Sequence, residues 1–293
     1  KDFQSANQYA SSTVFDFIRQ SDGKFVLVGQ FSTLSGSSAT RIGRITDSGS
    51  LDSTFDTGAG FNSNALRIIQ QTDGKYVVLG QFTQYSGSSV NRIVRINTDG
   101  TKDDTFDVGT GFNTNFGQST FGPGTGIEGD IVQQPDGKLV VVGPFTQYSG
   151  STANNIVRIT DNGSIDPDFN ISGSGFDSNP DLFTLALQPD GKIIVGGHGV
   201  TKYSGSSVSN ILRINTSGSI DSTFDPGTVN VTGAVTNLIV QDDNKIIISG
   251  GEPFLNDNFY EFIHWLISNK FSQNLSLIVF SNMTKLPKNY RLG

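Results

Sequence analysis

Short apolar runs bounded by glycine, aspartate or asparagine recur along most of the chain. In one stretch, an alternating segment at residues 66–71 leads through an Asp-Gly turn to the β-branched run 76–82. A small polar loop at residues 85–89 follows, then a third run at residues 92–96 and a second turn at residues 97–100. β-Branched and aromatic residues favour extended backbone, and Gly, Asp and Asn tolerate the positive φ that hairpin turns need. The pattern therefore predicts three or four short strands joined by tight turns.

This stretch is one unit of a tandem repeat marked by Asp-Gly-Lys. The aspartate stands at positions 22, 73, 136 and 190, and a weaker Asp-Asn-Lys begins at position 243. The successive spacings are 51, 63, 54 and 53 residues, and a glycine-rich insertion at residues 116–126 accounts for the long one. Three or four strands in about fifty residues, with no helical period, is typical of a propeller blade. We predict an all-β fold over residues 1–251, a β-propeller of about five blades with the last incomplete.

The repeat stops after Gly251, and residues 252–293 predict a different structure. Apolar residues between positions 259 and 267 fall at helical spacing, and residues 275–280 form an apolar run typical of a buried strand. We expect a short α/β tail of one helix and one strand. One hypothesis is that this strand completes the fifth blade, and the alternative is a junction between two unrelated reading frames.

Composition and charge narrow the classes of function. The chain has 35 glycines and 22 phenylalanines in 293 residues, a net charge of −7 and no basic stripe, so we expect no nucleic-acid partner. No apolar run reaches about twenty residues, which predicts no membrane-spanning helix. The absence of cysteine excludes disulfides, thiolate metal sites and iron–sulfur clusters, and we expect no cofactor.

An arginine and an aspartate recur once in each complete unit, eight residues apart. They could form a charged ring along a central channel, or an ion pair that holds each unit together. We favour the second interpretation, because an element present in every unit is usually part of its construction. The residues are Arg44, Arg95, Arg158 and Arg213 with Asp52, Asp103, Asp166 and Asp221.

Aromatic residues in two variable places are candidates for contact with a ligand or partner. Tyr85, Tyr148 and Tyr203 open the small polar loops, and Phe116 and Phe121 lie in the insertion. Aromatic rings beside small hydroxyl residues are typical of surfaces that bind sugars or proteins. The alternative for the tyrosines is a hairpin loop with one ring packed inside.

Two further features carry weaker signals of metal binding. His198 replaces the phenylalanine that ends the second strand in the first three units, and a structural or solvated role is favoured over a metal ligand. The turns at residues 97–103 and 161–166 resemble calcium loops but lack the full set of oxygen ligands. Turns stabilised by their own Asn and Asp side chains explain them better. We therefore predict no metal site and no catalytic residue.

The repeated sequence resembles a known family. Gln-x-Asp-Gly-Lys, a β run, Gly-x-Phe and then Arg-Ile-x-Arg-Ile-Asn-x-x-Gly-Ser-x-Asp-x-x-Phe is similar to the delta-60 repeat over residues 1–251. The resemblance implies propeller blades of secreted bacterial proteins or phage structural proteins, with a binding or structural role. Residues 249–293, with Gly-Gly-Glu-Pro at 250–253, resemble the interior of a radical S-adenosylmethionine enzyme. That family's chemistry needs a three-cysteine cluster motif, and this chain has no cysteine.

These observations predict a non-enzymatic structural or binding propeller. By family analogy, it would be a phage-particle or secreted cell-surface component, extracellular or in the virion, that contacts other structural proteins or a cell-surface glycan or protein. The first rival is a propeller hydrolase or lyase, which would need two or three unpaired carboxylates converging at the central axis. The second rival is an inactive remnant of a radical enzyme.

Overall fold

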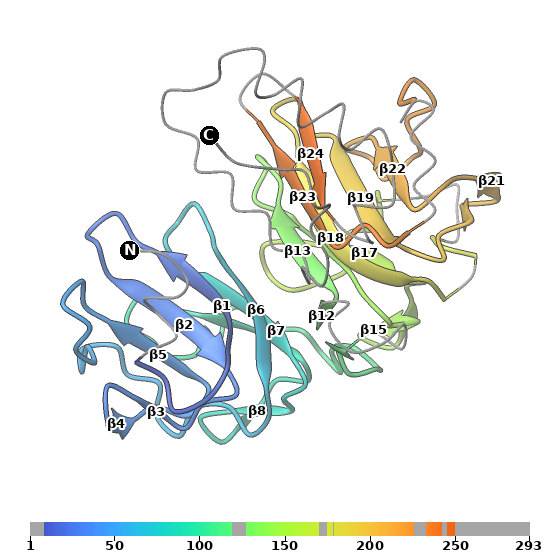
Figure 1. The fold of residues 1–293 in the computed structure, drawn as a ribbon. Coiled ribbons are helices and arrows are strands. Elements are labelled where there is room, and N and C mark those ends of the chain that lie inside the picture. Colours follow the sequence, from blue (N-terminus) through green and yellow to red (C-terminus); the bar gives the residue numbers. More distant parts are fainter. Residues whose placement is uncertain are drawn as a thin grey trace, which may run out of the picture.

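The computed structural model describes residues 9–118, 127–169, 175–177, 179–225, 233–241 and 245–249. Every regular element in these residues is a β-strand (Figure 1), as the repeat predicts. The expected helix and strand of the tail at residues 252–293 lie outside the described residues, as does Phe121.

The strands form five units, numbered here along the chain. Unit 1 has β1 (Val14–Arg19), β2 (Phe25–Gly29), β3 (Thr33–Leu34), β4 (Ser37–Ser38) and β5 (Ile42–Ile45). Unit 2 has β6 (Ala65–Gln70), β7 (Tyr76–Gly80), β8 (Gln84–Tyr85), β9 (Ser88–Ser89) and β10 (Ile93–Ile96). Unit 3 has β11 (Gly117–Gln118), β12 (Ile127–Glu128), β13 (Asp130–Gln133), β14 (Leu139–Val142), β15 (Gln147–Tyr148), β16 (Ser151–Thr152) and β17 (Ile156–Ile159). Unit 4 has β18 (Asp181–Leu187), β19 (Ile193–His198), β20 (Lys202–Tyr203), β21 (Ser206–Ser207) and β22 (Ile211–Ile214), and unit 5 has β23 (Asn237–Val240) and β24 (Ile246–Ser249).

Each of units 1 to 4 contains its own antiparallel sheet of three strands, and the strand order is the same in all four. The orders are β1-β2-β5, β6-β7-β10, β13-β14-β17 and β18-β19-β22, so the apolar strand after the Asp-Gly turn is always in the middle. Each turn glycine has φ between 82° and 87°, and the turn aspartate accepts the amide hydrogen of the following lysine, as Asp73 does from Lys75 at 3.1 Å. Glycine is required there because other residues rarely adopt this φ.

In each of units 1 to 4 the fourth strand is reduced to one bridged residue. The polar loop forms its own two-stranded hairpin, and after the outer strand a single bridge remains, such as Ile96 to Lys102. The chain then leaves the sheet because Asp103 bends it: its carboxylate accepts the amide hydrogen of Thr105 at 3.0 Å. The prediction of three or four strands is thus met by three strands and a bridge.

The units pack face to face in sequence order. The strands that come directly before the Asp-Gly turns, or before Asp-Asn in unit 5, are neighbours in the order β1, β6, β13, β18 and β23, and we call them the inner strands (Figure 1). Both faces of each complete middle strand are buried, and separate apolar clusters join units 1 and 2, 2 and 3, 3 and 4, and 4 and 5. The predicted all-β, propeller-like repeat is confirmed. None of the described residues forms a helix that is long and apolar enough to span a membrane.

Candidate binding site

The repeated arginine and aspartate form an ion-pair cluster within each complete unit. In unit 2, Asp103 accepts from Arg95 Nε at 2.6 Å and from Lys75 Nζ at 2.8 Å. The hydroxyl of Thr105 donates to the other carboxylate oxygen at 2.7 Å, and the guanidinium of Arg95 lies 4.8 Å from the centre of the Phe106 ring. Arg95 Nη1 also donates to the carbonyl of Asp161 at 2.5 Å, which ties unit 2 to a turn of unit 3.

The same cluster recurs in the other complete units. Its lysine is the lysine of the Asp-Gly-Lys marker, a role that the sequence prediction missed although the residue recurs with the turn. The arginines stand on β5, β10, β17 and β22, which the middle strands separate from the inner strands. The geometry therefore supports a structural ion pair over a charged ring along the axis. The members are Lys24, Arg44, Asp52 and Phe55; Lys138, Arg158, Asp166 and Phe169; and Lys192, Arg213, Asp221 and Phe224.

The electrostatics of the cluster fit this role. Burial by itself would raise the pKa of Asp103, but hydrogen bonds from Lys75, Thr105 and Arg95 outweigh it and hold that pKa below its usual range. The pKa of Asp166 is lowered in the same way, against burial, by Lys138 and Arg158. These carboxylates stay ionised because cations surround them.

The three loop tyrosines do not form a contact surface. Tyr85, Tyr148 and Tyr203 are each 0% exposed. Their hydroxyls donate to the carbonyls of Gly100, Gly163 and Gly218 at 2.5 to 2.6 Å, in the second turn of the same unit. The expectation of ligand contact is corrected: each ring closes the core beneath its hairpin, because a buried hydroxyl needs a partner and the turn carbonyl provides one.

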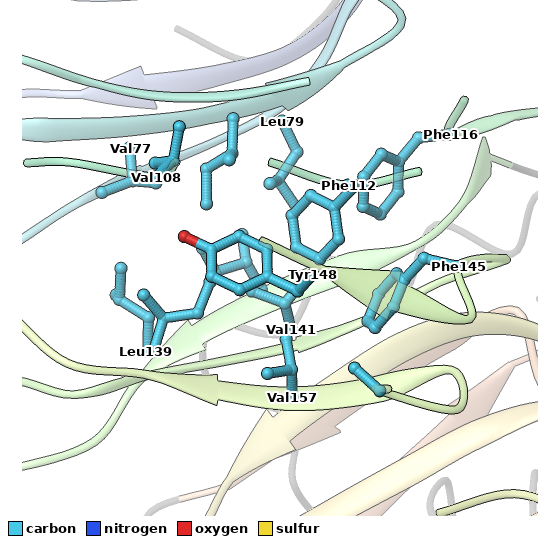
Figure 2. Packing of buried hydrophobic residues seen from close by; sticks show 14 of the residues in the cluster. Val77, Leu79, Val108, Phe112, Phe116, Leu139, Val141, Phe145, Tyr148 and Val157 are labelled. Carbon is cyan, nitrogen blue, oxygen red and sulfur yellow. The ribbon is translucent and has the colours of Figure 1, made fainter. Parts of the chain in front are cut away.

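Phe116 is also a core residue and not a contact residue. Its ring packs edge-to-face on Phe112, with centroids 5.1 Å apart, and beside Phe145 (Figure 2). A Cβ placed on Gly129 or Gly143 would lie 2.3 or 2.5 Å from this ring, so both positions must be glycine. The expectation for Phe116 was wrong because the insertion begins against the core, where β11 pairs with β12 in a small separate sheet.

His198 does not replace the phenylalanine; it follows Gly197 as Gln30 follows Gly29 and Gln81 follows Gly80. The backbone bond from Val208 to Thr201 matches that from Ala153 to Thr146 in unit 3, which aligns the buried Val200 with Phe145. His198 instead ends β19, opposite Asp181 on β18. The extra residue of unit 4 lies between His198 and Val200, and counting from the Asp-Gly turn places Gly199, not His198, level with Phe145.

The calcium-like turns are stabilised by their own side chains. Asp99 accepts the amide and hydroxyl hydrogens of Thr101, and Asn162 accepts the amide hydrogen of Ser164. Within the described ranges, no three carboxylate or imidazole groups gather in a metal-binding arrangement.

Every inner strand carries a polar residue at the same position, six residues before the turn aspartate, and the sequence prediction missed it. Asp16, Arg67 and Asp130 occupy it in units 1 to 3, followed by Thr184 and Asn237 in units 4 and 5. A bulge precedes the residue in β1, β6 and β18. Aligning the units on their Asp-Gly turns could have found this position, because these polar residues are separated by the same numbers of residues as the turn aspartates.

The two aspartates at this level connect neighbouring units. Asp16 accepts the amide hydrogen of Ile68 in the next unit at 3.0 Å, and Asp130 accepts that of Leu185 at 2.8 Å. Arg67 Nε lies 3.7 Å from the carboxylate of Asp130. Burial raises the pKa of Asp16 to about 6 and also raises that of Asp130. Both carboxyls are therefore structural links between inner strands.

Glu128, at the end of β12, differs from these two aspartates. It is 7% exposed, and its carboxyl makes no hydrogen bond or ion pair with any described residue. Burial, together with the negative charge of Asp181, raises the pKa of Glu128 to about 7. Gly129 donates its amide hydrogen to the carbonyl of Leu182 at 2.7 Å, which joins the end of β12 to β18, the strand that carries Asp181. Glu128 and Asp181, the acidic pair, are the candidate site.

Comparisons with known proteins identify the repeat. A family model described as a β-propeller domain of unknown function, DUF5122, matches residues 20–55, 71–106, 134–169 and 188–224. These are the four complete units marked by Asp-Gly-Lys, and the match ends before the tail. The resemblance of residues 249–293 to a radical S-adenosylmethionine enzyme has no support from the comparisons. No curated protein matches the chain.

Several solved structures are similar to this one at low identity. An inactive variant of virginiamycin B lyase from Staphylococcus aureus with quinupristin has 16% identity over 83% of this chain and 64% of its own, with a TM-score of 0.46. PorZ, a surface component of the type-IX secretion system of Porphyromonas gingivalis, has 13% identity over 85% and 34%, with a TM-score of 0.44. YCF48 bound to D1 peptide has 14% identity over 78% and 59%, with a TM-score of 0.42. The chain thus spans less than two thirds of each of these three proteins.

Proposed function

Given that this chain carries four DUF5122 β-propeller repeats, we propose that it is a non-enzymatic binding or structural propeller of five units. It serves as a component of a phage particle or of a secreted cell-surface assembly, where it contacts another protein or a surface glycan. The repeated arginines, lysines and aspartates support this role, because the described clusters use them to build the units.

The observation that carries the proposal is the exposed apolar surface of unit 5. Ile239 and Ile248 are 53% and 40% exposed. The residues at the position of Ile248 in units 1 to 4 are Leu27, Val78, Val141 and Val195, all fully buried. Among the described residues, β24 pairs only with β23, whereas each complete middle strand also pairs with an outer strand. An apolar sheet with an unpaired edge is suited to a protein partner that supplies a strand.

The test is a binding measurement on the whole chain. Purified protein should bind saturably to its source particle or cell surface, and the Ile239→Lys, Ile248→Lys double variant should lose that binding. Ser88→Lys, an exposed change in the hairpin of unit 2, should leave it intact. Equal binding by the double variant and the wild type would reject this surface. Turnover of a glycoside or lactone substrate by the pure chain would reject the non-enzymatic role.

A hydrolase or lyase is the second candidate, and Glu128 is the observation in its favour. A buried carboxyl with a pKa near 7 is suited to proton transfer. However, the reaction needs two or three available carboxyls, and Asp16 and Asp130 are already bound to the backbone of the next unit. This favours binding over catalysis.

A further inference from the structure

Unit 5 has the first half of a repeat unit. Among the described residues it contains an inner strand, β23, and a middle strand, β24, but no outer strand (Figure 1). Leu238 pairs with Ile248 in the register in which Leu185 pairs with Val195 in unit 4. Gln241 also donates its amide hydrogen to the carbonyl of the marker lysine at 2.8 Å, as the equivalent glutamine does in the other units. Unit 5 therefore follows the complete units as far as the edge of β24.

The edge of β24 closely matches the edge that holds an outer strand in unit 4. β24 begins with Ile246-Ile247-Ile248 and β19 begins with Ile193-Ile194-Val195. Val195 is fully buried, whereas Ile248 is 40% exposed. An outer strand beside β24 would cover Ile248 as it covers the corresponding residue of β19. In unit 4 the outer strand pairs with these three positions through Ile214, Arg213 and Leu212.

The outer segment of a unit is a self-contained piece of sequence. In unit 4 it consists of β22 and the Asp-x-x-Phe turn that follows it. Arg213 Nε donates to the carboxylate of Asp221 at 2.8 Å within this segment. Arg213 Nη1 also donates to Oε1 of Gln188 at 3.3 Å, and Gln241 stands at the position of Gln188 in unit 5. The segment therefore brings its own ion pair to the sheet and uses a glutamine there as acceptor.

The sequence of this chain limits the source of such a segment. Its outer strands β5, β10, β17 and β22 pair with their own middle strands, so a second copy has none of these four to offer. After Gly251 the sequence contains no further Ile-x-Arg-Ile run. An ordinary apolar strand would cover Ile248 but would bring no arginine to Gln241. A different polypeptide with the outer-segment pattern satisfies both requirements.

We propose that β24 binds the outer segment of another polypeptide that carries the same repeat. The segment adds to unit 5 as an antiparallel strand, with its Ile-x-Arg-Ile run against residues 246–248 and its arginine donating to Gln241. Main-chain hydrogen bonds supply affinity, and the alternating side chains supply specificity. This inference rests on the proposed protein contact through unit 5 and names the chemistry of the partner.

The experiment is a titration of the full chain against a fluorescent peptide with the sequence of residues 209–224, followed by anisotropy. Wild-type protein should bind the peptide saturably. Ile248→Lys should weaken binding by about tenfold, because it places a charge against the leucine of the added strand. Ser88→Lys adds the same charge to the exposed hairpin of unit 2 and should bind as the wild type does. A peptide of the same composition in scrambled order should not bind.

The contribution of the arginine is measured in the same titration. A peptide with Arg213→Met should bind wild-type protein about fivefold more weakly, because it loses a charged hydrogen bond. The same change should have no effect on binding to the Gln241→Ala chain, which lacks the acceptor. A fivefold loss with both chains would show that the arginine does not act through Gln241, which would contradict the proposed position of the segment.

The register of the added strand is tested with disulfides, because the chain contains no cysteine of its own. Ile248→Cys in the chain should cross-link to a peptide carrying Leu212→Cys, since paired residues of neighbouring strands bring their Cβ atoms within reach. A peptide carrying Arg213→Cys has its thiol on the opposite face and should cross-link about tenfold more slowly.

Three outcomes would overturn the proposal. One is the absence of saturable peptide binding by wild-type protein, which is the result expected if the tail or a second copy occupies the edge of β24. Another is equally fast cross-linking of the two cysteine peptides. The third is equal binding by wild type and Ile248→Lys, with far-UV circular dichroism showing that the variant is folded. If the Ile239→Lys, Ile248→Lys variant loses particle binding but no peptide binds, this inference fails and the protein-contact proposal stands.

Discussion

The ion-pair cluster of unit 2 and the acidic pair between units 3 and 4 use carboxyls in opposite ways. Asp103 is surrounded by Lys75, Arg95 and Thr105, and its pKa is held below the usual range. Glu128 is also buried but has no cation bound to it among the described residues, and burial together with the charge of Asp181 raises its pKa to about 7. The first arrangement recurs in four units, and the second occurs once. Burial alone therefore does not distinguish the two kinds of carboxyl, whereas the presence or absence of a neighbouring cation does.

The largest expected effect on the free energy of unfolding is that of replacing Phe116, whose ring fills the core of unit 3 where Glu128 stands in place of an apolar residue. Phe116→Ala should lower the free energy of unfolding by about 3–5 kcal/mol, since it leaves a cavity against Phe112 and Phe145. Urea denaturation followed by circular dichroism measures this loss. Thr114→Ala, an exposed change near the same insertion, serves as the control. A cost below about 1 kcal/mol would mean that the ring is not part of the core.

Removing the charge of Asp103 in the ion-pair cluster of unit 2 should have the next largest effect on the free energy of unfolding. Asp103→Asn leaves Arg95 and Lys75 beside a neutral amide, and we expect a loss of about 3 kcal/mol in the free energy of unfolding. The loss lies at the low end for buried ion pairs because the side chain of Lys75 is 30% exposed and can turn to water. Asp104→Asn, with an 87% exposed side chain, should cost less than about 0.5 kcal/mol. Equal losses for the two variants would contradict a structural role for the cluster.

Glu128 should have the smallest effect on the free energy of unfolding. Its contribution should decrease as pH rises, whereas that of an aspartate with a lowered pKa, such as Asp103, increases. The folded state holds the proton of Glu128 up to a pKa of about 7, while the unfolded chain loses it near 4.5, so stability falls as pH rises through this window. Between pH 6 and pH 8 the contribution of Glu128 is a loss of about 1 kcal/mol. Glu128→Gln should remove that part of the slope.

The measurement is urea denaturation of both proteins at pH 6, 7 and 8. This range avoids most of the contribution of Asp16, whose pKa of about 6 acts in the same direction at lower pH. Parallel stability curves for wild type and Glu128→Gln would show that Glu128 is not protonated in the folded state near neutral pH. Glu128 would then be ionised near neutral pH, as the aspartates of the ion-pair clusters are.

Local sequence predicted the units well, because their elements depend on nearby residues. The Asp-Gly turns, the β-branched middle strands and the arginine–aspartate pairs all lie within spans of about thirty residues, and each was predicted from its own segment. The interpretation of the pairs as structural also rested on their recurrence. The fourth strand was the local exception, because the carboxylate of Asp103 ends the sheet after one bridge.

The sequence by itself determined that this chain is a repeat of small β units with a departure in unit 3. Only the tertiary structure decided which polar and aromatic residues are available. Tyr148 is hidden by a turn fifteen residues away, Phe116 fills the core beside Gly143, and the charge of Asp181 from the next unit acts on Glu128. Such contacts depend on how a strand is displaced by a bulge or a glycine and on which unit packs beside it. Neither can be obtained from spacing alone, since one inserted residue such as Gly199 or one positive φ at Gly129 changes which side chains meet.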